Sequence, residues 1–472
     1  MSNVAFKKSL WKFRYFFVVL FFCVFFGTYL GSWMYSFEHR AEFFSNPIET
    51  TIRLLENRAI RNINHSNGYI TALIMGIDSR ELRFDGEEFT GKDIHTDTII
   101  QLVYDYNANN LFMISIPRDT GIAIDESCTT QEYDKAINRL YAAGQNGMCE
   151  NGGVGLMMKY TEEVTGFENH YFALVSFETF YDFFEVIGEN RDGENGLWID
   201  IPENVYEYYP VGDHFEYFEL QKGYQFLSSE ELLRYARSRK STSDFVRARR
   251  QQIVIEAVKD QIISEGLSDP AKIFEIYNSF RDNALYSEIT LDEIVAGVSF
   301  LDNVANANVY NLVLDDTIGG QNAYMVKPSF SPPYGKHTRP GFYLTPVAYA
   351  DDCCKEDDFF KVKQYLESIF SYPSVYFEEA DVALYTSSGT QEELPLAVEE
   401  WLELDPPLNS LTISEIAFTP DFEEEIIVVV FGDGSYPVTI EYLEDKLNAQ
   451  VKEVDETKLT PRNGEDIGIF IQ

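Results

Sequence analysis

The feature that most constrains this chain is an uncharged, apolar run near its N-terminus, from Tyr15 to Phe37. About 20 apolar residues in a helix, rising about 1.5 Å each, are enough to cross the hydrocarbon core of a bilayer. The run therefore predicts one transmembrane helix over residues 15–37. Four basic and no acidic residues precede it, and acidic residues follow it from Glu38 onward. This bias predicts a single-pass protein of the cell membrane, with residues 1–14 cytoplasmic and everything from residue 38 extracytoplasmic.

A cleavable signal peptide is the competing interpretation of the same run. Signal peptides carry a shorter apolar core and a cleavage site of small residues. The run from Tyr15 to Phe37 is longer than such a core, and no clean small-residue site follows it. The sequence favours a retained anchor.

The chain is strongly acidic, with a formal net charge of −40 over 472 residues. A field of this sign repels nucleic acid and anionic lipid surfaces, so neither is expected as a general partner. Any anionic ligand must then be captured by a local group of basic residues.

Cysteine and histidine usage gives little support to nucleophile or zinc chemistry. Six histidines and the absence of a Gly-x-Ser-x-Gly elbow leave a hydrolase triad unsupported, and no grouping has zinc-site spacing. Cys128 and Cys149 are either a disulfide outside the cell or free thiols, and both alternatives stay open.

Three candidate strands place charged side chains at one edge of a predicted sheet. A buried strand over Tyr69–Met75 runs into Asp78, and Asp97–Tyr104 and Asn110–Ile116 read as a hairpin that ends before Arg118. If the first and third strands run one way and the second runs back, Asp78, Asp97 and Arg118 share that edge. When each of these residues is considered alone, a structural role in a turn or a helix cap is more common than a functional one. Their joint placement is what indicates a site.

The remaining pattern predicts an α/β protein: a three-layer α/β/α domain with a mixed central sheet, followed by a small α/β domain. Within the large domain the expected further elements are Lys135–Ala143, Leu156–Val164, Tyr171–Phe177, Phe180–Ile187 and Leu197–Ile201. The aromatic residues between Tyr171 and Phe184 are expected in the core, with a lipid-tail pocket as the alternative. In the small domain the expected elements are Asp381–Tyr385, Leu394–Leu402, Glu425–Phe431, Thr439–Leu447 and Asp466–Gln472.

Basic residues concentrate between Arg234 and Arg250, which hold seven of the 37 lysines and arginines in the chain. Ser228 and Glu231 have capping-box spacing, which predicts the start of a helix, and Asp244 is a candidate N-cap for a second helix. An acidic chain that concentrates arginine in this way is expected to bind an anion there.

On the second helix, 100° per residue places Arg247, Arg250 and Gln251 on the side of Val254 and Val258. The opposite, polar side is predicted to hold Arg249, Gln252, Glu256 and Lys259. Buried arginines are costly unless they are paired, and a pyrophosphate would supply the missing charge through bidentate contacts. The alternative is a solvated basic helix with weak surface ion pairs. Asp78 and Asp97 are hard oxygen ligands suited to Mg²⁺, with Mn²⁺ as a substitute, held together with the substrate phosphates.

Five short motifs appear in the order typical of one family. They are Gly76-Ile77-Asp78-Ser79-Arg80, Thr96-Asp97-Thr98, Ser115-Ile116-Pro117-Arg118-Asp119-Thr120, Tyr235-Ala236-Arg237-Ser238-Arg239 and the run from Asp244 to Gln252. Together they resemble the LytR-CpsA-Psr family of cell-wall glycopolymer transferases over about residues 66–310. One departure is His95, two positions before Asp97, where the family often has a basic residue, so a phosphate contact there is expected to be weaker or pH-dependent.

The resemblance implies a Mg²⁺-dependent phosphotransferase that moves a glycopolymer from a polyprenyl-pyrophosphate carrier to peptidoglycan or another surface acceptor. By matching positions, it implies metal ligation by Asp78 and Asp97. The residues implied to bind the phosphates are Arg80, Arg118, Arg237, Arg239, Arg247, Arg250 and Gln251, and those implied in catalysis are Asp78, Asp97, Arg118, Arg237 and Arg239. A non-catalytic binding or sensing protein and a lipid pyrophosphatase are the alternative functions.

The resemblance also organises the chain into segments. After the tail (1–14) and the transmembrane helix (15–37) come a juxtamembrane linker (38–65), the catalytic domain (66–310), a connecting segment (311–379) and a LytR-like C-terminal domain (380–472). The glycan, the acceptor and the general base are not specified by the sequence.

Overall fold

The computed structural model describes most of the chain beyond residue 64, with gaps. The described residues are 65–77, 83–84, 89–90, 94–122, 136–149, 152–191, 193–211, 214–238, 244–264, 285–286, 303–315, 325–326, 345–346, 359–386, 394–395, 398, 401–402, 408, 410–415, 426–431, 436–453, 461 and 466–471. The expected transmembrane helix at residues 15–37 lies outside this set. None of the helices within the set is both long enough and apolar enough to span a bilayer.

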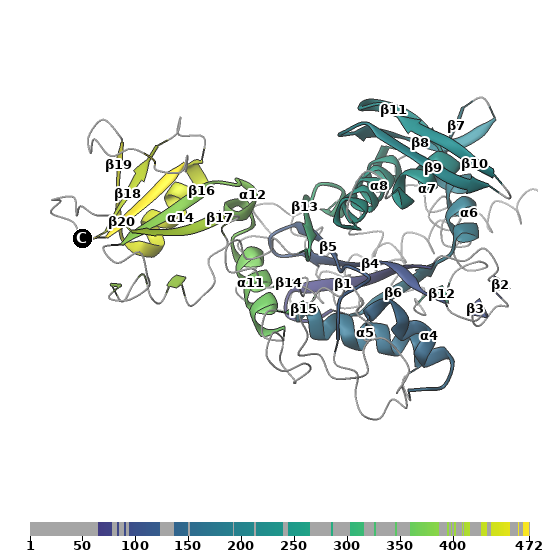
Figure 1. The fold of residues 1–472 in the computed structure, drawn as a ribbon, viewed down its shortest axis with the longest axis horizontal. Helices are drawn as coiled ribbons and strands as arrows, with labels where there is room; N and C mark the ends of the chain where they lie inside the picture. Colours follow the sequence, from purple (N-terminus) through teal and green to yellow (C-terminus); the bar gives the residue numbers. More distant parts are fainter. Residues whose placement is uncertain are drawn as a thin grey trace, which may run out of the picture. The chain divides into compact units, whose positions relative to one another are not determined.

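A six-stranded mixed sheet forms the centre of the larger part of the molecule (Figure 1). Its order is β12 (Leu285–Tyr286), β6 (Tyr171–Val175), β1 (Tyr69–Ile77), β4 (Thr96–Asp105), β5 (Asn110–Ser115) and β13 (Asn308–Val313). β4 is antiparallel to both β1 and β5, so β1 and β5 run in the same direction. The predicted strand directions, on which the shared edge of the site depends, are confirmed. β6 beside β1 and β13 beside β5 are parallel pairs, which makes the sheet mixed as expected.

Helices cover both faces of this sheet (Figure 1). On one face lie a 3-10 turn (Ile137–Arg139), α4 (Leu140–Gln145) and α5 (Gly152–Thr165), and α8 (Asp244–Ser264) lies over the other. The core between sheet and helices is aliphatic and aromatic and includes Leu73, Met75, Phe112, Met157 and Tyr160, all fully buried. Cys149, at its margin, is disulfide-bonded, and Cys128 lies outside the described residues.

A second core lies between α8 and a long, bent β-ribbon. β8 (Glu194–Ile201) and β9 (Val205–Val211) follow one another along one side of the ribbon, and β10 (His214–Leu220) and β11 (Gly223–Ser228) along the other. Ile201 pairs with Gly223 and Val205 with Leu220, so the ribbon continues across a corner at residues 202–204. Its inner face packs on α6 (Phe177–Ile187) and α7 (Ser229–Arg237), and β7 (Glu189–Arg191) pairs with the edge of β8.

The aromatic side chains of α6 are buried to different degrees. Phe184 is in the second core as predicted, Phe180 and Phe183 pack against it while partly buried, and Tyr181 is 36% exposed. The helix begins after Ser176, whose hydroxyl accepts a hydrogen bond from the backbone N–H of Thr179. Both the core role and the lipid-tail alternative remain predictions for the partly buried aromatic residues.

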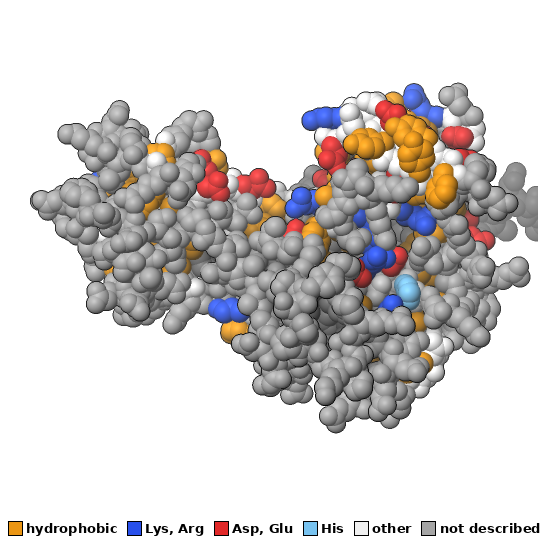
Figure 2. All heavy atoms as spheres, viewed as in Figure 1, with side chains coloured by type: hydrophobic (Ala, Val, Ile, Leu, Met, Phe, Trp, Pro, Cys, Tyr) orange, Lys and Arg blue, Asp and Glu red, His pale blue; other side chains and the backbone are white. Residues whose placement is uncertain are grey.

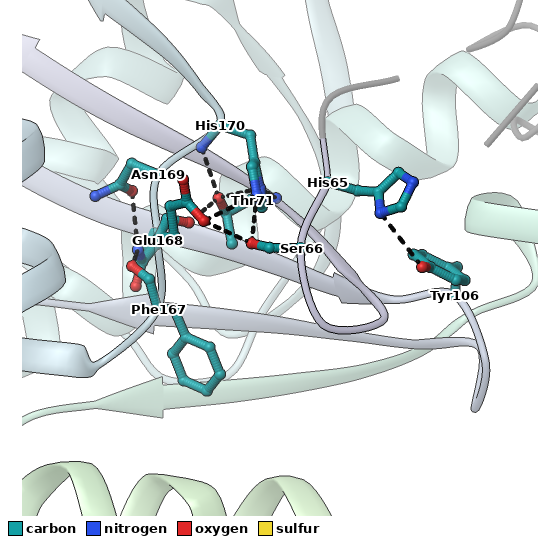
Figure 3. A network of polar contacts seen from close by, with 9 residues as sticks. His65, Ser66, Thr71, Tyr106, Phe167, Glu168, Asn169 and His170 are labelled. Atoms are coloured by element: carbon teal, nitrogen blue, oxygen red, sulfur yellow. Dashed lines mark hydrogen bonds and ion pairs between the residues drawn. The ribbon is translucent and has the colours of Figure 1, made fainter. Parts of the chain in front are cut away.

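A buried polar network joins the start of β1 to the segment that enters β6 (Figure 3). His170 Nδ1 accepts from the backbone N–H of Thr71 at 3.0 Å, and His170 Nε2 lies 2.8 Å from Ser66 Oγ, which donates to Glu168. Gln101 donates to Asn169 Oδ1 at 2.8 Å and extends the network onto β4. These contacts fix the two parallel strands at the end of the sheet opposite to Asp97.

The C-terminal part of the chain has its own five-stranded mixed sheet, in the order β17 (Ser410–Glu415), β16 (Asp381–Thr386), β20 (Ile467–Ile471), β18 (Ile426–Val430) and β19 (Gln450–Glu453). α14 (Pro437–Leu447) packs on it through Tyr442, Leu443 and Leu447. The expected strands and the last helix are present, and β17 and β19 are additional. Within the expected helix Leu394–Leu402, only part of the residues are described.

Two helices within the segment expected to be a connection are part of the packed structure. α11 (Phe360–Ser371) contributes Val362, Leu366 and Ile369 to the core of the central sheet, and α12 (Pro373–Phe377) follows it. The remaining short strands are β2 (Arg83–Phe84), β3 (Phe89–Thr90), β14 (Met325–Val326) and β15 (Thr345–Pro346).

Candidate active site

The ends of β4 and β5 bring Asp97 and Arg118 together. β4 begins at Thr96, opposite Ile77 of β1, and Asp97 is its second residue. β5 ends at Ser115, and the chain continues along the same edge to Arg118. Arg118 Nη1 lies 3.1 Å from each carboxylate oxygen of Asp97. Asp97 and Arg118 therefore lie at the same edge, as the strand directions predicted, and the ion pair between them is an additional finding.

The loop that carries Arg118 is held by its backbone. The N–H of Asn138 donates to the carbonyl of Arg118 at 3.2 Å, and the N–H of Ile137 donates to the carbonyl of Thr120 at 2.9 Å. Thr96 Oγ1 donates to the carbonyl of Asn138. Because the 3-10 turn contacts both strand ends, the separation of Asp97 and Arg118 is set by the fold rather than by their own ion pair alone.

α8 delivers a second arginine and an amide to this edge. Arg247, only 5% exposed, donates from Nη2 to the backbone carbonyl of Asp97 at 3.1 Å. Gln251, one turn later, donates from Nε2 to Thr98 Oγ1 at 2.8 Å and to the carbonyl of Ala236. The inward placement that the helical wheel predicted for these residues is confirmed.

Arg250 is the most deeply buried cation of the described residues, at 2% exposure. Its Nη1 donates to the carbonyl and the hydroxyl of Ser238 at 3.1 and 3.0 Å, and its Nη2 lies 2.9 Å from Glu203 Oε1 at the ribbon corner. Within the described part of the chain, Arg250 Nε and the hydroxyl of Tyr235 are buried without a hydrogen-bond partner. Burial raises the pKa of Tyr235 to about 12, so its hydroxyl stays protonated at neutral pH.

The last turn of α7 adds two arginines with different surroundings. The capping box predicted at Ser228 and Glu231 starts this helix. Arg237 lies with its guanidinium 4.3 Å from the ring centre of Phe177. Arg234 forms ion pairs with Glu216 and Glu230 at 3.0 and 2.6 Å, which is the weak surface pairing expected for a solvated basic residue. The basic cluster is thus divided between buried arginines of α8 and a partly exposed arginine that is paired with surface acids.

Several predicted residues lie outside the described part of the chain, namely Asp78, Arg80 and Arg239. The structure brings together Asp97, Arg118, Arg247 and Gln251, and sets Arg250 beside the end of α7, where Arg237 lies. It adds Glu203 and Ser238, which the sequence analysis missed. Glu203 carried no signal because it is a single acid in a turn.

Gln252 corrects the helical-wheel prediction. It was assigned to the polar side of α8, but it is 1% exposed and donates to the carbonyls of Met113 and Leu312 and to Ser115 Oγ, all within 2.9 Å. On the side expected to face solvent, Arg249 is exposed as predicted, whereas Gln252 packs on β5 and β13. The prediction failed because α8 is covered on two sides.

The donor set suits a phosphate anion and a hard divalent cation. The guanidinium groups of Arg118 and Arg247, from two separate segments, meet at Asp97, and guanidinium groups match phosphate oxygens bidentately. The carboxylate of Asp97 is a suitable ligand for Mg²⁺, and β1 ends one residue before Asp78. Within the described residues, no three histidine, cysteine, aspartate or glutamate side chains gather as a metal site. At this edge the described part offers Asp97, with Asp119 on the other side of Arg118, and substrate oxygens and Asp78 would add to Asp97 as metal ligands.

Comparison with known proteins agrees with the sequence motifs. The Bacillus subtilis proteins named polyisoprenyl-teichoic acid–peptidoglycan teichoic acid transferase TagT and TagV are each 26% identical to this chain, over 255 and 261 residues. Each match covers 54% of this chain, with 71% of TagT and 60% of TagV. The crystal structure of B. subtilis TagV is 21% identical over 65% of this chain and 99% of its own, with a TM-score of 0.44. Residues 41–329, more than half of the chain, match the LytR_cpsA_psr family, and the chain belongs to that family.

Proposed function

We propose that this protein transfers a glycopolymer from a polyprenyl-pyrophosphate carrier to peptidoglycan or a similar wall acceptor. As a family member the chain is an enzyme of the phosphotransferase type. The observation that carries the proposal is the meeting of Arg118 and the buried Arg247 at Asp97, with the buried Arg250 further along the same helix, in a chain whose net charge is −40. Arg250 is paired with Glu203, and Arg247 donates to the carbonyl of Asp97, so a phosphate anion would bind in exchange for such contacts. The names of TagT and TagV, with a teichoic acid donor and peptidoglycan, supply the substrate classes.

The reaction is a phosphoryl transfer between two oxygen atoms. A hydroxyl of the acceptor attacks the phosphorus that carries the glycan, and the bridging P–O bond of the pyrophosphate breaks. Polyprenyl phosphate leaves, the glycan phosphate becomes a phosphodiester of the acceptor, and the hydroxyl proton passes to solvent. Such transfers need positioning and charge stabilisation more than covalent chemistry by the protein.

The arginines have distinct tasks in this scheme. Arg118 and Arg247 lie around Asp97 and bind the phosphate nearest the metal, and Arg250 binds the neighbouring phosphate in exchange for Glu203. Gln251 fixes α8 against Thr98 so that the guanidinium groups keep their spacing. Arg237, with Arg80 and Arg239 from outside the described residues, completes the proposed phosphate site.

Asp97, together with Asp78, would hold a Mg²⁺ ion. When bound, the ion neutralises charge on the phosphates and polarises the phosphoryl group under attack. Arg118 contacts both carboxylate oxygens of Asp97, so Arg118 would turn from the carboxylate to the phosphate when the metal and the substrate bind.

The proposal extends to the rest of the chain. Residues 15–37 anchor the protein in the cell membrane, with the catalytic domain outside, where the carrier lipid and the wall are both within reach. The sheet of β16 to β20 is proposed to be the LytR-like C-terminal domain. Its role is not assigned.

The test compares two neighbouring arginines of α8. The full chain is incubated with Mg²⁺, a polyprenyl-pyrophosphate glycan and peptidoglycan fragments, and polyprenyl phosphate and the phosphodiester adduct are followed by mass spectrometry. Arg250→Lys keeps the positive charge but loses the bidentate hydrogen bonding of the guanidinium group, and is expected to slow transfer by about 100-fold or more. Arg249→Lys is the matched control, because Arg249 is 63% exposed, and its rate should be unchanged.

The outcomes separate the alternatives. Lipid that binds but stays unchanged, even with Mg²⁺ and acceptor, favours the sensing protein. Free phosphorylated glycan without adduct favours the pyrophosphatase. Equal rates in the two arginine variants would remove Arg250 from the site.

A further inference from the structure

The outward face of the β-ribbon carries a row of exposed aromatic rings. Tyr206, Tyr208, Phe215, Tyr217 and Tyr224 are between 53% and 70% exposed. Figure 2 shows orange side chains gathered over the strands that Figure 1 labels β8 to β11. Large apolar side chains grouped on one surface usually mark a binding site. We call these five residues, with Trp198, the aromatic face.

The rings are fixed by the ribbon rather than loosely displayed. Tyr208 and Tyr217 are directly opposite each other on β9 and β10, with ring centres 5.1 Å apart. On the other half, Trp198 and Tyr224 stack at 5.3 Å with an interplanar angle of 14°, and Arg191 lies 4.6 Å above the Trp198 ring. Because the inner face of the ribbon is packed in a core, the outward rings form a rigid surface.

The side-chain types and charges of the aromatic face indicate which class of ligand it can bind. Its large exposed side chains are all aromatic, and among the described residues no exposed large aliphatic side chain lies on the ribbon. Exposed carboxylates accompany the rings at Glu194, Asp200 and Glu219, and outnumber the exposed cations described on the ribbon, Arg191 and Lys222. Anionic lipid surfaces and anionic polymers are repelled by such a surface, more so in a chain of charge −40. A neutral ligand with C–H groups for the rings and hydroxyl donors for the carboxylates is favoured.

A pyranose chain has this combination of groups. The axial C–H bonds of the sugar ring carry partial positive charge and fit the negative face of an aromatic ring. Sugar hydroxyls and amide N–H groups donate hydrogen bonds, which carboxylates accept strongly. We propose that the aromatic face binds the neutral sugar backbone of the acceptor, a β-linked chain of acetylated amino sugars.

The ribbon is physically continuous with the candidate active site. Glu203, at the ribbon corner, pairs with buried Arg250 at 2.9 Å, and Glu216 of β10 pairs with Arg234 of α7. A sugar chain held along the ribbon is therefore anchored to the same elements that hold the phosphates. This inference rests on the proposed function for its choice of acceptor over donor, because the donor of the named relatives is an anionic polymer.

The experiment measures sugar binding without any transfer reaction. The full chain is titrated with chitohexaose, a neutral β-linked N-acetylglucosamine oligomer, and with a glycerol-phosphate oligomer of similar length, using calorimetry. The expected result is binding of chitohexaose alone. Tyr208→Ala combined with Tyr217→Ala should weaken it by about tenfold, because both rings of the opposed pair are removed.

The control is Phe360→Ala, which removes a 58% exposed aromatic ring outside the ribbon and should leave binding unchanged. Tyr224→Ala tests the other half of the aromatic face, where Tyr224 stacks on Trp198, and leaves the Tyr208–Tyr217 ring pair unchanged. Circular dichroism melting shows that each variant is folded.

Three results would overturn the proposal. They are undetectable chitohexaose binding by the unaltered chain, equal affinity in the double variant, and preference for the glycerol-phosphate oligomer. Flotation with phosphatidylcholine vesicles, or self-association in sedimentation, that disappears in the double variant would reassign the face to lipid or to a second copy. Sugar binding without transfer activity would instead keep the aromatic face and reject the proposed function.

Discussion

His170 shows how one buried side chain can make stability depend on pH. Its Nδ1 accepts the backbone N–H of Thr71 at 3.0 Å, so the proton of the neutral ring is on Nε2, facing Ser66. A second proton on Nδ1 would set two N–H groups against each other. Burial lowers the pKa of His170, with the Glu168 carboxylate opposing and His65 adding to the effect. Tyr69, whose ring centre is 6.0 Å away, completes the surroundings.

The expected consequence is a loss of stability in mild acid. In the unfolded chain His170 binds a proton near pH 6.5, while in the folded chain it resists protonation. The stabilisation is therefore fully present above about pH 6.5 and is lost as the pH falls toward the lower, folded-state pKa. His170→Asn keeps an acceptor for Thr71 and removes the titration, so its unfolding free energy should fall less between pH 7.5 and 5.5.

The difference in unfolding free energy between the unaltered chain and His170→Asn isolates the contribution of His170. Urea denaturation at several pH values gives the unfolding free energy of each, and groups common to both cancel. Glu162, whose pKa is raised chiefly by burial, is one of those common groups and acts in the opposite direction. A difference that does not change with pH would contradict the assignment.

At the element scale, α8 shows what a pattern of residues can and cannot predict. The wheel identified Arg247, Arg250 and Gln251 correctly, because those side chains follow the same stripe as Val254. It failed for Gln252, because the wheel assumes one buried side, and α8 has the central sheet on one side and the ribbon core on the other. A polar residue of such a helix can be buried where backbone carbonyls accept its hydrogen bonds, as those of Met113 and Leu312 do for Gln252.

Gln252→Leu is expected to destabilise the fold by about 1–3 kcal/mol, since buried carbonyls of Met113 and Leu312 would lose a donor. The free energy of unfolding in urea measures the loss. Asp260→Leu on the same helix is a fitting control, because Asp260 is exposed and such changes usually stay within about 0.5 kcal/mol. Equal stability of the Gln252 variant and the parent would show that the three hydrogen bonds contribute nothing net.

The strands were unequally predictable for a physical reason. β1, β4 and β5 are rich in apolar residues, which drive their burial, and the sequence predicted the ends of each strand to within two residues. β9 and β10 were missed because Tyr206, Tyr208 and Tyr217 face outward, so aromatic residues occupy both sides of the strands and the expected alternation disappears. The exposed aromatic residues that obscured the strand pattern of β9 and β10 are the same residues that we propose to bind sugar.

On the scale of the whole molecule, the dominant property is the net charge of −40. It does not come from the candidate site, where carboxylates and guanidinium groups are paired, such as Asp97 with Arg118 and Glu203 with Arg250. It comes from acids distributed over the rest of the chain, since aspartate and glutamate outnumber lysine and arginine by 77 to 37. Like charges repel one another and favour expanded states of the chain.

Salt should therefore stabilise this protein. The screening length falls from about 10 Å at 0.1 M to about 3 Å at 1 M ionic strength, so repulsion between surface acids weakens, while the half-buried pair of Arg250 and Glu203 is affected less. We expect the thermal midpoint, followed by circular dichroism, to rise between 0.05 and 0.5 M NaCl by about 2 °C for each kcal/mol gained. KCl should act like NaCl, because screening depends on ionic strength and not on the cation. A midpoint that falls with both salts would mean that the exposed ion pairs outweigh the repulsion, and that the acidic surface does not limit stability.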